Sequence, residues 1–221
     1  MKKTVSLFWF RRDLRLHDNH GLYVALKHNT DVLPIFIFDT SILDALPKND
    51  ARVEFIHEQL KTIHTTLQAH ASGLSVYYGL PEKIFDQLTN EYEVKAVYCN
   101  RDYEPYALSR DKSILNLLDS KSIGFETFKD HVIFEQNEIN DNTILIGHSA
   151  GCAFLLRWLM ENKQKVNKLI LVAPAIMNEE SGSYEQYLDL LKFDIDKNVK
   201  DYVDEVIIFI SNDKKRIIKS V

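Results

Sequence analysis

The sequence has little glycine, proline or cysteine, and it has no long apolar run. Its 221 residues include 7 Gly, 5 Pro and 2 Cys, and 45% are hydrophobic, a composition typical of a packed globule rather than a disordered chain. The longest apolar runs, 32–38 and 169–173, are far shorter than the roughly 20 residues of a membrane span. No long apolar segment follows the N-terminal Met-Lys-Lys. We therefore expect a cytoplasmic protein with one large or two small domains and no membrane partner.

An excess of positive charge is also missing. Residues 1–140 contain 16 Lys/Arg and 20 Asp/Glu, and residues 141–221 contain 11 and 12. Because proteins that grip a phosphate backbone usually carry a basic surface, we expect neither half alone to bind nucleic acid. The composition leaves the oligomeric state open.

Metal-site patterns are absent as well. The two cysteines, Cys99 and Cys152, lack metal-ligand spacing and lie in apolar stretches, which favours buried free thiols. Histidines are frequent in the first half, but three of them fall on one predicted helix at intervals of seven and six, with no acid in a recognised ligand pattern. We predict no metal site.

Short apolar runs alternate with helical patterns along the first 130 residues. Strands are predicted at 5–10, 32–38, 74–78, 94–99 and 125–128, and helices at 19–28, 50–70, 81–92 and 104–120. In the second of these helices, one apolar stripe consists of Val53, Ile56, Leu60, Ile63 and Leu67. Strands that are apolar on both faces and joined by helices predict an α/β fold: a Rossmann-like parallel sheet with helices on both faces. Ligands of such sheets bind beyond the carboxyl ends of the strands.

The same alternation resumes after residue 140. Strands are predicted at 143–146, 168–173 and 205–210, and helices at 151–162 and near 184–191. The segment 130–142 has no helical period, so we place a domain boundary there, giving domains 1–140 and 141–221. Three parallel strands alone would leave an exposed edge, so the second piece is expected to dock on the first sheet or to extend it.

Two motifs in the first half resemble the DNA photolyase and cryptochrome family. FWFRRDLRLHDNHGL at 8–22 resembles the opening of that family, and NRDYEPYALSRD at 100–111 resembles the loop after its fourth strand. The resemblance covers about residues 4–139. It implies an α/β domain that carries or abuts a light-harvesting antenna chromophore. Flavin binding and DNA repair belong in that family to a following helical domain that these 221 residues do not resemble, so neither its FAD nor DNA repair by this chain alone is expected.

The loops after the first, second and fourth strands offer aromatic faces and charged donors to a flat heterocycle. The candidate ligand residues are Phe10, Arg11, Arg12, Asp39, Asn100, Arg101, Asp102 and Glu104. A structural role competes with this one: Asp18 or Asn19 can cap the first helix, and ion pairs between Arg12, Asp13, Arg15 and Asp18 can lock the first loop.

The resemblance also bears on which chromophore to expect. Folate-binding members of the family have an Asn-Glu pair in the fourth loop, where this chain has Tyr106 and Ala107. That difference disfavours folate and leaves a deazaflavin, a flavin or no chromophore.

The second half has the form strand, Gly-x-Ser-x-Gly, helix. ILIGHSAGCAFLLRWL at 144–159, KLILVAPA at 168–175 and the last predicted strand resemble small α/β-hydrolases related to the retinoblastoma-binding serine hydrolase, over about residues 142–221. Gly147 and Gly151 would permit the sharp turn that presents Ser149, and the amide of Ala150 would face an oxyanion. The resemblance implies Asp213 as the acid of an incomplete triad.

The base that such a triad requires is not evident. All eight histidines lie before Ser149, whereas α/β-hydrolases place the histidine after the acid. Without a base, a serine hydroxyl is a weak nucleophile, so we favour a turn-forming role for the motif. Three hypotheses follow: a composite chain, natural fusion or engineered chimera, that at most binds a chromophore or nucleotide; a serine esterase or amidase that acts through Ser149; and an inactive scaffold.

Overall fold

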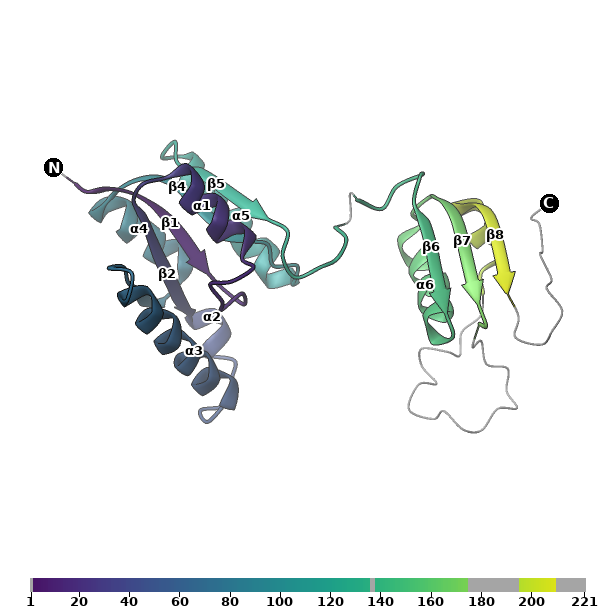
Figure 1. Ribbon diagram of the computed structural model, residues 1–221, viewed down its shortest axis with the longest axis horizontal. Coiled ribbons are helices and arrows are strands. Elements are labelled where there is room, and N and C mark those ends of the chain that lie inside the picture. The colour runs from purple at the N-terminus through teal and green to yellow at the C-terminus, as the bar shows by residue number, and fades with distance from the viewer. Residues whose placement is uncertain (1, 136–137, 175–194, 210–221) are drawn as a thin grey trace. The chain divides into compact units, whose positions relative to one another are not determined.

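The computed structural model describes residues 2–135, 138–174 and 195–209, and these form two compact units, 1–133 and 134–221 (Figure 1). The division lies close to the predicted boundary at residue 140. The docking of the second unit on the first stays a prediction. No helix in the described part of the chain has both the length and the apolar character needed to cross a bilayer.

The first unit alternates strands and helices as the sequence predicts. Its elements are β1 (Thr4–Phe10), α1 (His20–His28), β2 (Val32–Asp39), α2 (Thr40–Leu43), α3 (Ala51–Gln68), β3 (Ser75–Gly79), α4 (Pro81–Glu91), β4 (Glu93–Asn100), α5 (Pro105–Asp119) and β5 (Gly124–Phe128). Local chemistry explains several of the helix starts. Asn19 and Asp50 cap α1 and α3 with their side chains, and a proline occupies the first turn of α4 and of α5. The short helix α2 was not predicted.

The five strands form one parallel sheet in the order β3-β2-β1-β4-β5. The chain runs outward from β1 to β3 and then crosses to β4 on the other side of β1. The order therefore reverses between β1 and β4, and the loops that follow these two strands part there. Such a switch point is where open α/β sheets bind their ligands.

Two hydrophobic cores lie on opposite faces of this sheet. Alternate residues of β1 separate them: Trp9 packs with the side chains of α4 and α5, whereas Phe8 and Phe10 pack with those of α1 and α3. All three aromatic side chains are at most 2% exposed. The prediction of a parallel sheet with helices on both faces is thus confirmed.

The second unit contains a smaller parallel sheet, in the order β6-β7-β8. Its elements are β6 (Ile144–His148), α6 (Ala150–Asn162), β7 (Val166–Val172), the 3-10 helix η3 (Lys197–Tyr202) and β8 (Val203–Phe209). Side chains of α6 and η3 pack on its inner face, while Ile144 and Ile146 of β6 are exposed.

Within the described residues these three strands form a sheet of their own, and the expected extension of the first sheet stays a prediction, like the docking. The predicted helix near 184–191 and the candidate acid Asp213 lie outside the described residues.

Candidate functional site

A buried hydrogen-bond cluster joins the loops after β1 and β4. The Asn100 side chain donates to Asp13 Oδ2 (2.7 Å) and to Asn19 Oδ1 (2.8 Å), and it accepts from the Gly21 amide (2.9 Å). Asp13 also accepts from the Arg11 amide (2.8 Å). Asn100, Asp13, Asn19 and Arg11 are each under 9% exposed. Because water has little access to them, their polar atoms depend on one another for hydrogen-bond partners. Asn100 is thus a structural link between the two loops.

Arg11 lies beside this cluster and is also buried. Its guanidinium donates to both carboxylate oxygens of Asp111 (2.7 and 2.5 Å) and to the carbonyl of Asn100. Arg110 donates to the same carboxylate (2.9 Å). The Cζ atoms of Arg11 and Arg110 lie 5.1 and 4.8 Å from the ring centroid of Trp9, within the range of cation–π attraction. One carboxylate and one indole therefore hold two guanidinium groups at the end of β1.

A cavity of about 740 Å³ opens next to these groups, beyond the carboxyl ends of β1 and β2. Its inner wall combines buried aromatic and charged side chains: Trp9, Phe10, Arg11, Phe36, Asp39, Asp102 and Arg110. Its outer wall comes from α2, the following loop and the first half of α3. The volume lies within the range of typical small-molecule sites, about 300–1,000 Å³, and apolar walls with a few fixed polar groups are their usual lining.

Asp39 and Tyr106 form a polar contact on the cavity wall. The Tyr106 hydroxyl donates to Asp39 Oδ2 (2.7 Å), and Asp39 Oδ1 accepts from the Ser41 amide (3.0 Å). Burial and the hydrogen bond to Asp39 raise the pKa of the Tyr106 hydroxyl, which keeps it protonated at neutral pH. Asp39 therefore ties the end of β2 to the starts of both α2 and α5.

Six of the eight predicted ligand residues line this cavity: Phe10, Arg11, Arg12, Asp39, Asp102 and Glu104. The other two do not. Asn100 is engaged in the cluster described above. Arg101 donates to Thr127 Oγ1 (3.0 Å) and lines a smaller cavity of about 290 Å³ beside β5. Arg101 thus lies beside β5, whereas Asn100 lies in the buried cluster and Asp102 lines the larger cavity.

The ion pairs predicted for the first loop have different partners in the structure. Arg15 pairs with Asp130, and Arg12 with Asp102 (3.5 Å) and Glu104 (3.3 Å). Asn19 is the cap of α1, with Oδ1 accepting from the Leu22 amide (3.1 Å). These pairs join the first loop to segments about 90 to 115 residues later, so no local pattern indicated them.

Several residues that line the cavity were not predicted, although two of them, Trp9 and Arg110, lie within the photolyase-type motifs. The residues not predicted are Trp9, Phe36, Phe38, Ile42, Arg52, Phe55, Gln59 and Arg110. On α3, Arg52, Phe55 and Gln59 recur at three- and four-residue steps beside the stripe that was predicted for the core. Tyr106 and Ala107, named above only for the folate comparison, also line the cavity.

The second unit shows the geometry of a sharp strand-to-helix turn. Ser149 has φ +53° and ψ −121° between β6 and α6, a strained conformation for a residue with a side chain. A Cβ on Gly147 would lie 3.0 Å from the backbone of Cys152, a tight contact that favours glycine there. Apart from its chain neighbours and its own helix backbone, no described atom lies within 4 Å of a Cβ built on Gly151, so close packing does not account for that glycine among the described residues.

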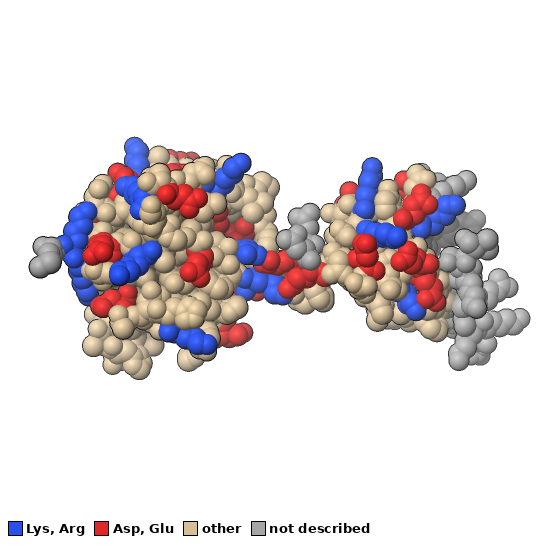
Figure 2. Space-filling view, turned by 90° about the horizontal axis from the view of Figure 1, so that it is seen from above, with Lys and Arg blue, Asp and Glu red and all other residues tan. Residues whose placement is uncertain are grey.

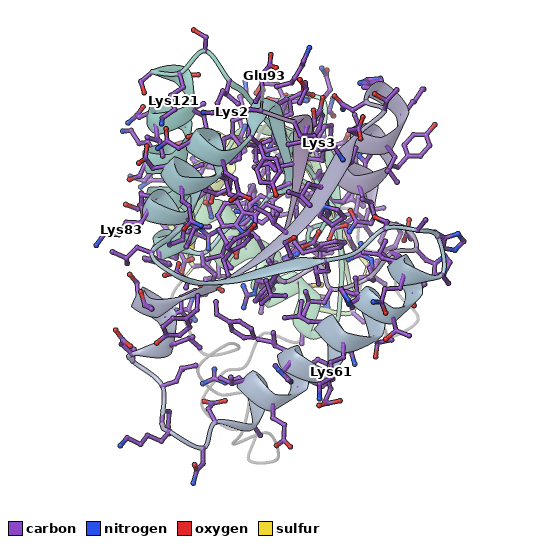
Figure 3. The ribbon with its side chains drawn as sticks, turned by 90° about the vertical axis from the view of Figure 1, so that its left-hand side faces the viewer. Lys2, Lys3, Lys61, Lys83, Glu93 and Lys121 are labelled. Atoms are coloured by element: carbon purple, nitrogen blue, oxygen red, sulfur yellow. The ribbon has the colours of Figure 1, made fainter. Side chains whose placement is uncertain are left out.

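Charged residues of both signs are interspersed on the face of the molecule shown in Figure 2. Figure 3 views the first unit from its N-terminal end and labels lysines of the N-terminus, α3, α4 and the turn after α5, with Glu93 among them. Three of these lysines have acidic partners: Lys3 with Asp31 (3.4 Å), Lys61 with Glu58 (2.7 Å) and Lys121 with Asp86 (2.7 Å). Such pairing reduces the positive potential available to a polyanion.

The cysteines are buried, and the described residues contain no metal-binding cluster. Both cysteines are free and buried. Burial raises the pKa of the Cys99 thiol to about 12. No cluster of three or more His, Cys, Asp or Glu side chains suited to a metal ion occurs in the part of the chain that the structure describes.

The first unit of the structure is a Rossmann-like α/β domain with a cavity beyond the carboxyl ends of β1 and β2. Comparison with known proteins identifies its kind. The family model of DNA photolyase matches residues 6–146, and that of serine hydrolase matches residues 121–214. Since the first match covers more than half of the sequence, the chain belongs to the DNA photolyase family. The two matches overlap at residues 121–146, on either side of the predicted boundary.

Individual relatives agree with this assignment. A deoxyribodipyrimidine photo-lyase of Synechococcus is 32% identical over 133 residues, which are 60% of this chain and 28% of the relative. Cryptochrome-1 of Drosophila melanogaster is 32% identical over 139 residues, covering 60% of this chain and 26% of the relative. The chain thus spans little more than a quarter of the length of these proteins.

Solved structures give the same result. A class III photolyase from Agrobacterium tumefaciens has a TM-score of 0.56 at 28% identity. The match covers 64% of this chain and 29% of the photolyase chain. A photolyase from Sulfolobus tokodaii is described with two FAD molecules and an implied novel light-harvesting cofactor. It has a TM-score of 0.55 at 26% identity, and the match covers 86% of this chain and 42% of the photolyase chain.

Proposed function

We propose that the first unit binds a flat heterocyclic chromophore, a flavin or a deazaflavin, in the cavity beyond β1 and β2. The observation that carries this proposal is the cavity itself, which combines aromatic walls with fixed guanidinium and carboxylate groups at the switch point of the sheet. The Sulfolobus tokodaii photolyase, described with two FAD molecules and the implication of a novel light-harvesting cofactor, supports a ligand of this class. Folate is the less favoured alternative.

The residues present fit such a ligand. Arg12 and Glu104 are exposed at the mouth of the cavity, and the ion pair between them is long, at 3.3 Å. A ligand can therefore form hydrogen bonds to both side chains through its ring substituents. Arg11 and Arg110 are already occupied by Asp111, so their contribution is to shape and charge the inner wall. A bound flavin or deazaflavin would supply absorption of blue or near-ultraviolet light. The protein would supply an apolar enclosure and a fixed ring orientation.

A binding titration tests the proposal. Riboflavin, FMN, FAD and 5-deazariboflavin would each be added to the purified chain, with ligand fluorescence as the readout. Gln59→Trp places a large ring on the cavity wall and should weaken binding at least tenfold. Gln68→Trp, at an exposed position of the same helix outside the cavity, should leave binding unchanged. No saturable binding of any of the four ligands would refute the proposal and favour the inactive scaffold.

We further propose that the chain is a composite in which the photolyase-type unit is joined to a hydrolase fragment, without DNA repair or nucleic-acid binding by this chain alone. The serine hydrolase match over residues 121–214 supports the first part, and the mixed surface charge supports the second. The free buried cysteines favour a reducing compartment such as the cytoplasm. A gel-shift assay with ultraviolet-irradiated DNA tests the nucleic-acid expectation, and a retarded band would contradict it.

Serine hydrolysis through Ser149 is the second candidate, favoured by the strained turn at the start of α6. A fluorophosphonate probe would label the folded chain, and the label would be lost in Ser149→Ala. An unlabelled folded protein would exclude a conventional serine hydrolase.

A further inference from the structure

The two walls of the cavity differ in how well they are packed. The residues of the inner wall from β1, β2 and the fourth loop are mostly buried, with Trp9, Phe10 and Phe36 at most 6% exposed. The outer wall is formed by residues 40–59, and none of them is buried. Phe55 is 63% exposed and Ile42 is 44% exposed. The outer wall therefore presents two apolar side chains, Phe55 and Ile42, that are largely uncovered.

Both ends of this segment are nevertheless fixed. At its start, Asp39 is 6% exposed and binds the Ser41 amide and the Tyr106 hydroxyl. At its end, α3 enters the core through Leu60 and Ile63, each 4% exposed. Between these ends Ile56 packs partly against the core, but no residue of 40–59 is buried. Such sparse apolar packing is typical of regions that open locally at little free-energy cost.

One face of α3 is directed to the cavity. Arg52, Phe55, Ile56 and Gln59 all line it, and their spacing of three and four residues places them on a single side of the helix. Arg52 is held in an ion pair with the helix cap Asp50 (2.6 Å), which leaves the Phe55 ring as the largest apolar surface of that face. A flat ligand on the inner wall would offer this ring a face to stack on.

We propose that residues 40–59 form a lid that packs onto the bound heterocycle, with Phe55 as the residue that stacks on the outer face of its ring and Ile42 closing the edge. This inference rests on the proposed chromophore binding. It assigns the ligand a sandwiched position and makes Phe55 a determinant of affinity. A ligand without an aromatic or apolar outer face would bind the inner wall but leave the lid open.

Hydrogen exchange of the whole chain, with and without saturating FMN, tests the lid. In the free protein, amides in peptides of residues 51–59 should exchange at least tenfold faster than those of residues 60–68 in the same helix. With FMN bound, the peptides of residues 40–59 should slow at least tenfold, while β6 to β8 should not change. FMN binding would be measured in the same samples by fluorescence.

A pair of variants provides the matched control. Phe55→Ala should weaken FMN binding at least fivefold. Leu108→Ala, which truncates a similarly exposed apolar side chain on α5, should have no effect. FMN that binds without protecting residues 40–59, or binds Phe55→Ala as tightly as the unaltered chain, would overturn the lid and leave the proposed function standing. Failure of FMN, riboflavin, FAD and 5-deazariboflavin to bind would instead refute the proposed function, and the lid with it.

Discussion

Replacement of Asn100 by alanine tests the view that this residue is a structural link rather than a ligand contact. The substitution removes two donated bonds, one of them to the Asp13 carboxylate, and one bond accepted from the Gly21 amide. A hydrogen bond to a charged group contributes about 1.5–3 kcal/mol and a neutral one about 0.5–1.5 kcal/mol. Since Asn100 is 2% exposed, water cannot easily replace these bonds. We expect a loss of about 4 kcal/mol in the free energy of unfolding of the first unit.

The measurement is urea unfolding followed by tryptophan fluorescence. In a Trp158→Phe background, Trp9 is the single tryptophan, so the signal reports the first unit. For a unit of this size, about 4 kcal/mol corresponds to a fall of about 15 °C in Tm. Asn90→Ala, which removes a single exposed contact of 3.5 Å, should cost under about 0.5 kcal/mol. A loss below about 1 kcal/mol for Asn100→Ala would refute the structural role.

Three further predictions concern individual side chains. Gly21→Ala places its Cβ 2.7 Å from Asn100 Oδ1 and should cost about 1–3 kcal/mol; the cost should shrink in an Asn100→Ala background, and an additive double variant would contradict the contact. Ser149→Gly should stabilise the second unit by about 1–3 kcal/mol by relieving the backbone strain at φ +53°, seen as slower amide exchange in α6, whereas equal exchange in Ser149→Gly and Ser149→Ala would argue against strain. The pKa of Cys99 is raised to about 12, while an unfolded cysteine ionises near about 8.5. The folded state then holds more protons, so stability should fall as the pH rises from about 9 toward 12, by up to about 1.4 kcal/mol per pH unit. The free energy of unfolding should fall less steeply with pH in Cys99→Ala. Urea unfolding of both proteins at about pH 8 to 11 measures this, and equal slopes of stability against pH would refute the raised pKa of Cys99.

Much of the first unit was predictable because local patterns specify it. Every predicted strand and helix of this unit is present, with ends within a few residues, since apolar periodicity distinguishes helix from strand. The apolar stripe on α3 was predicted correctly only in part. Leu60 and Ile63 are buried, whereas Val53 and Ile56 are half-buried, because half of the helix lies over a cavity rather than over the sheet.

The candidate site was predicted less completely. The strand ends that surround it were identified, because side chains at the carboxyl ends of parallel strands meet at one edge. Periodicity does not reveal which side chain of a loop turns inward. Asn100 and Arg101 are adjacent in the sequence, yet one is buried in a hydrogen-bond cluster and the other lies beside β5.

The sequence by itself determined the α/β class, the photolyase-type motifs and the strand, turn and helix around Ser149, since each depends on residues close together in the chain. Only the tertiary structure decided the order of the strands, the separate second sheet and the cavity with one packed and one unpacked wall. The walls of the cavity and the link between its loops depend on contacts between distant residues, such as Tyr106 with Asp39, 67 positions apart, and Asn100 with Asp13, 87 positions apart. Such contacts form only when the fold brings distant residues together, so a local sequence pattern does not predict them.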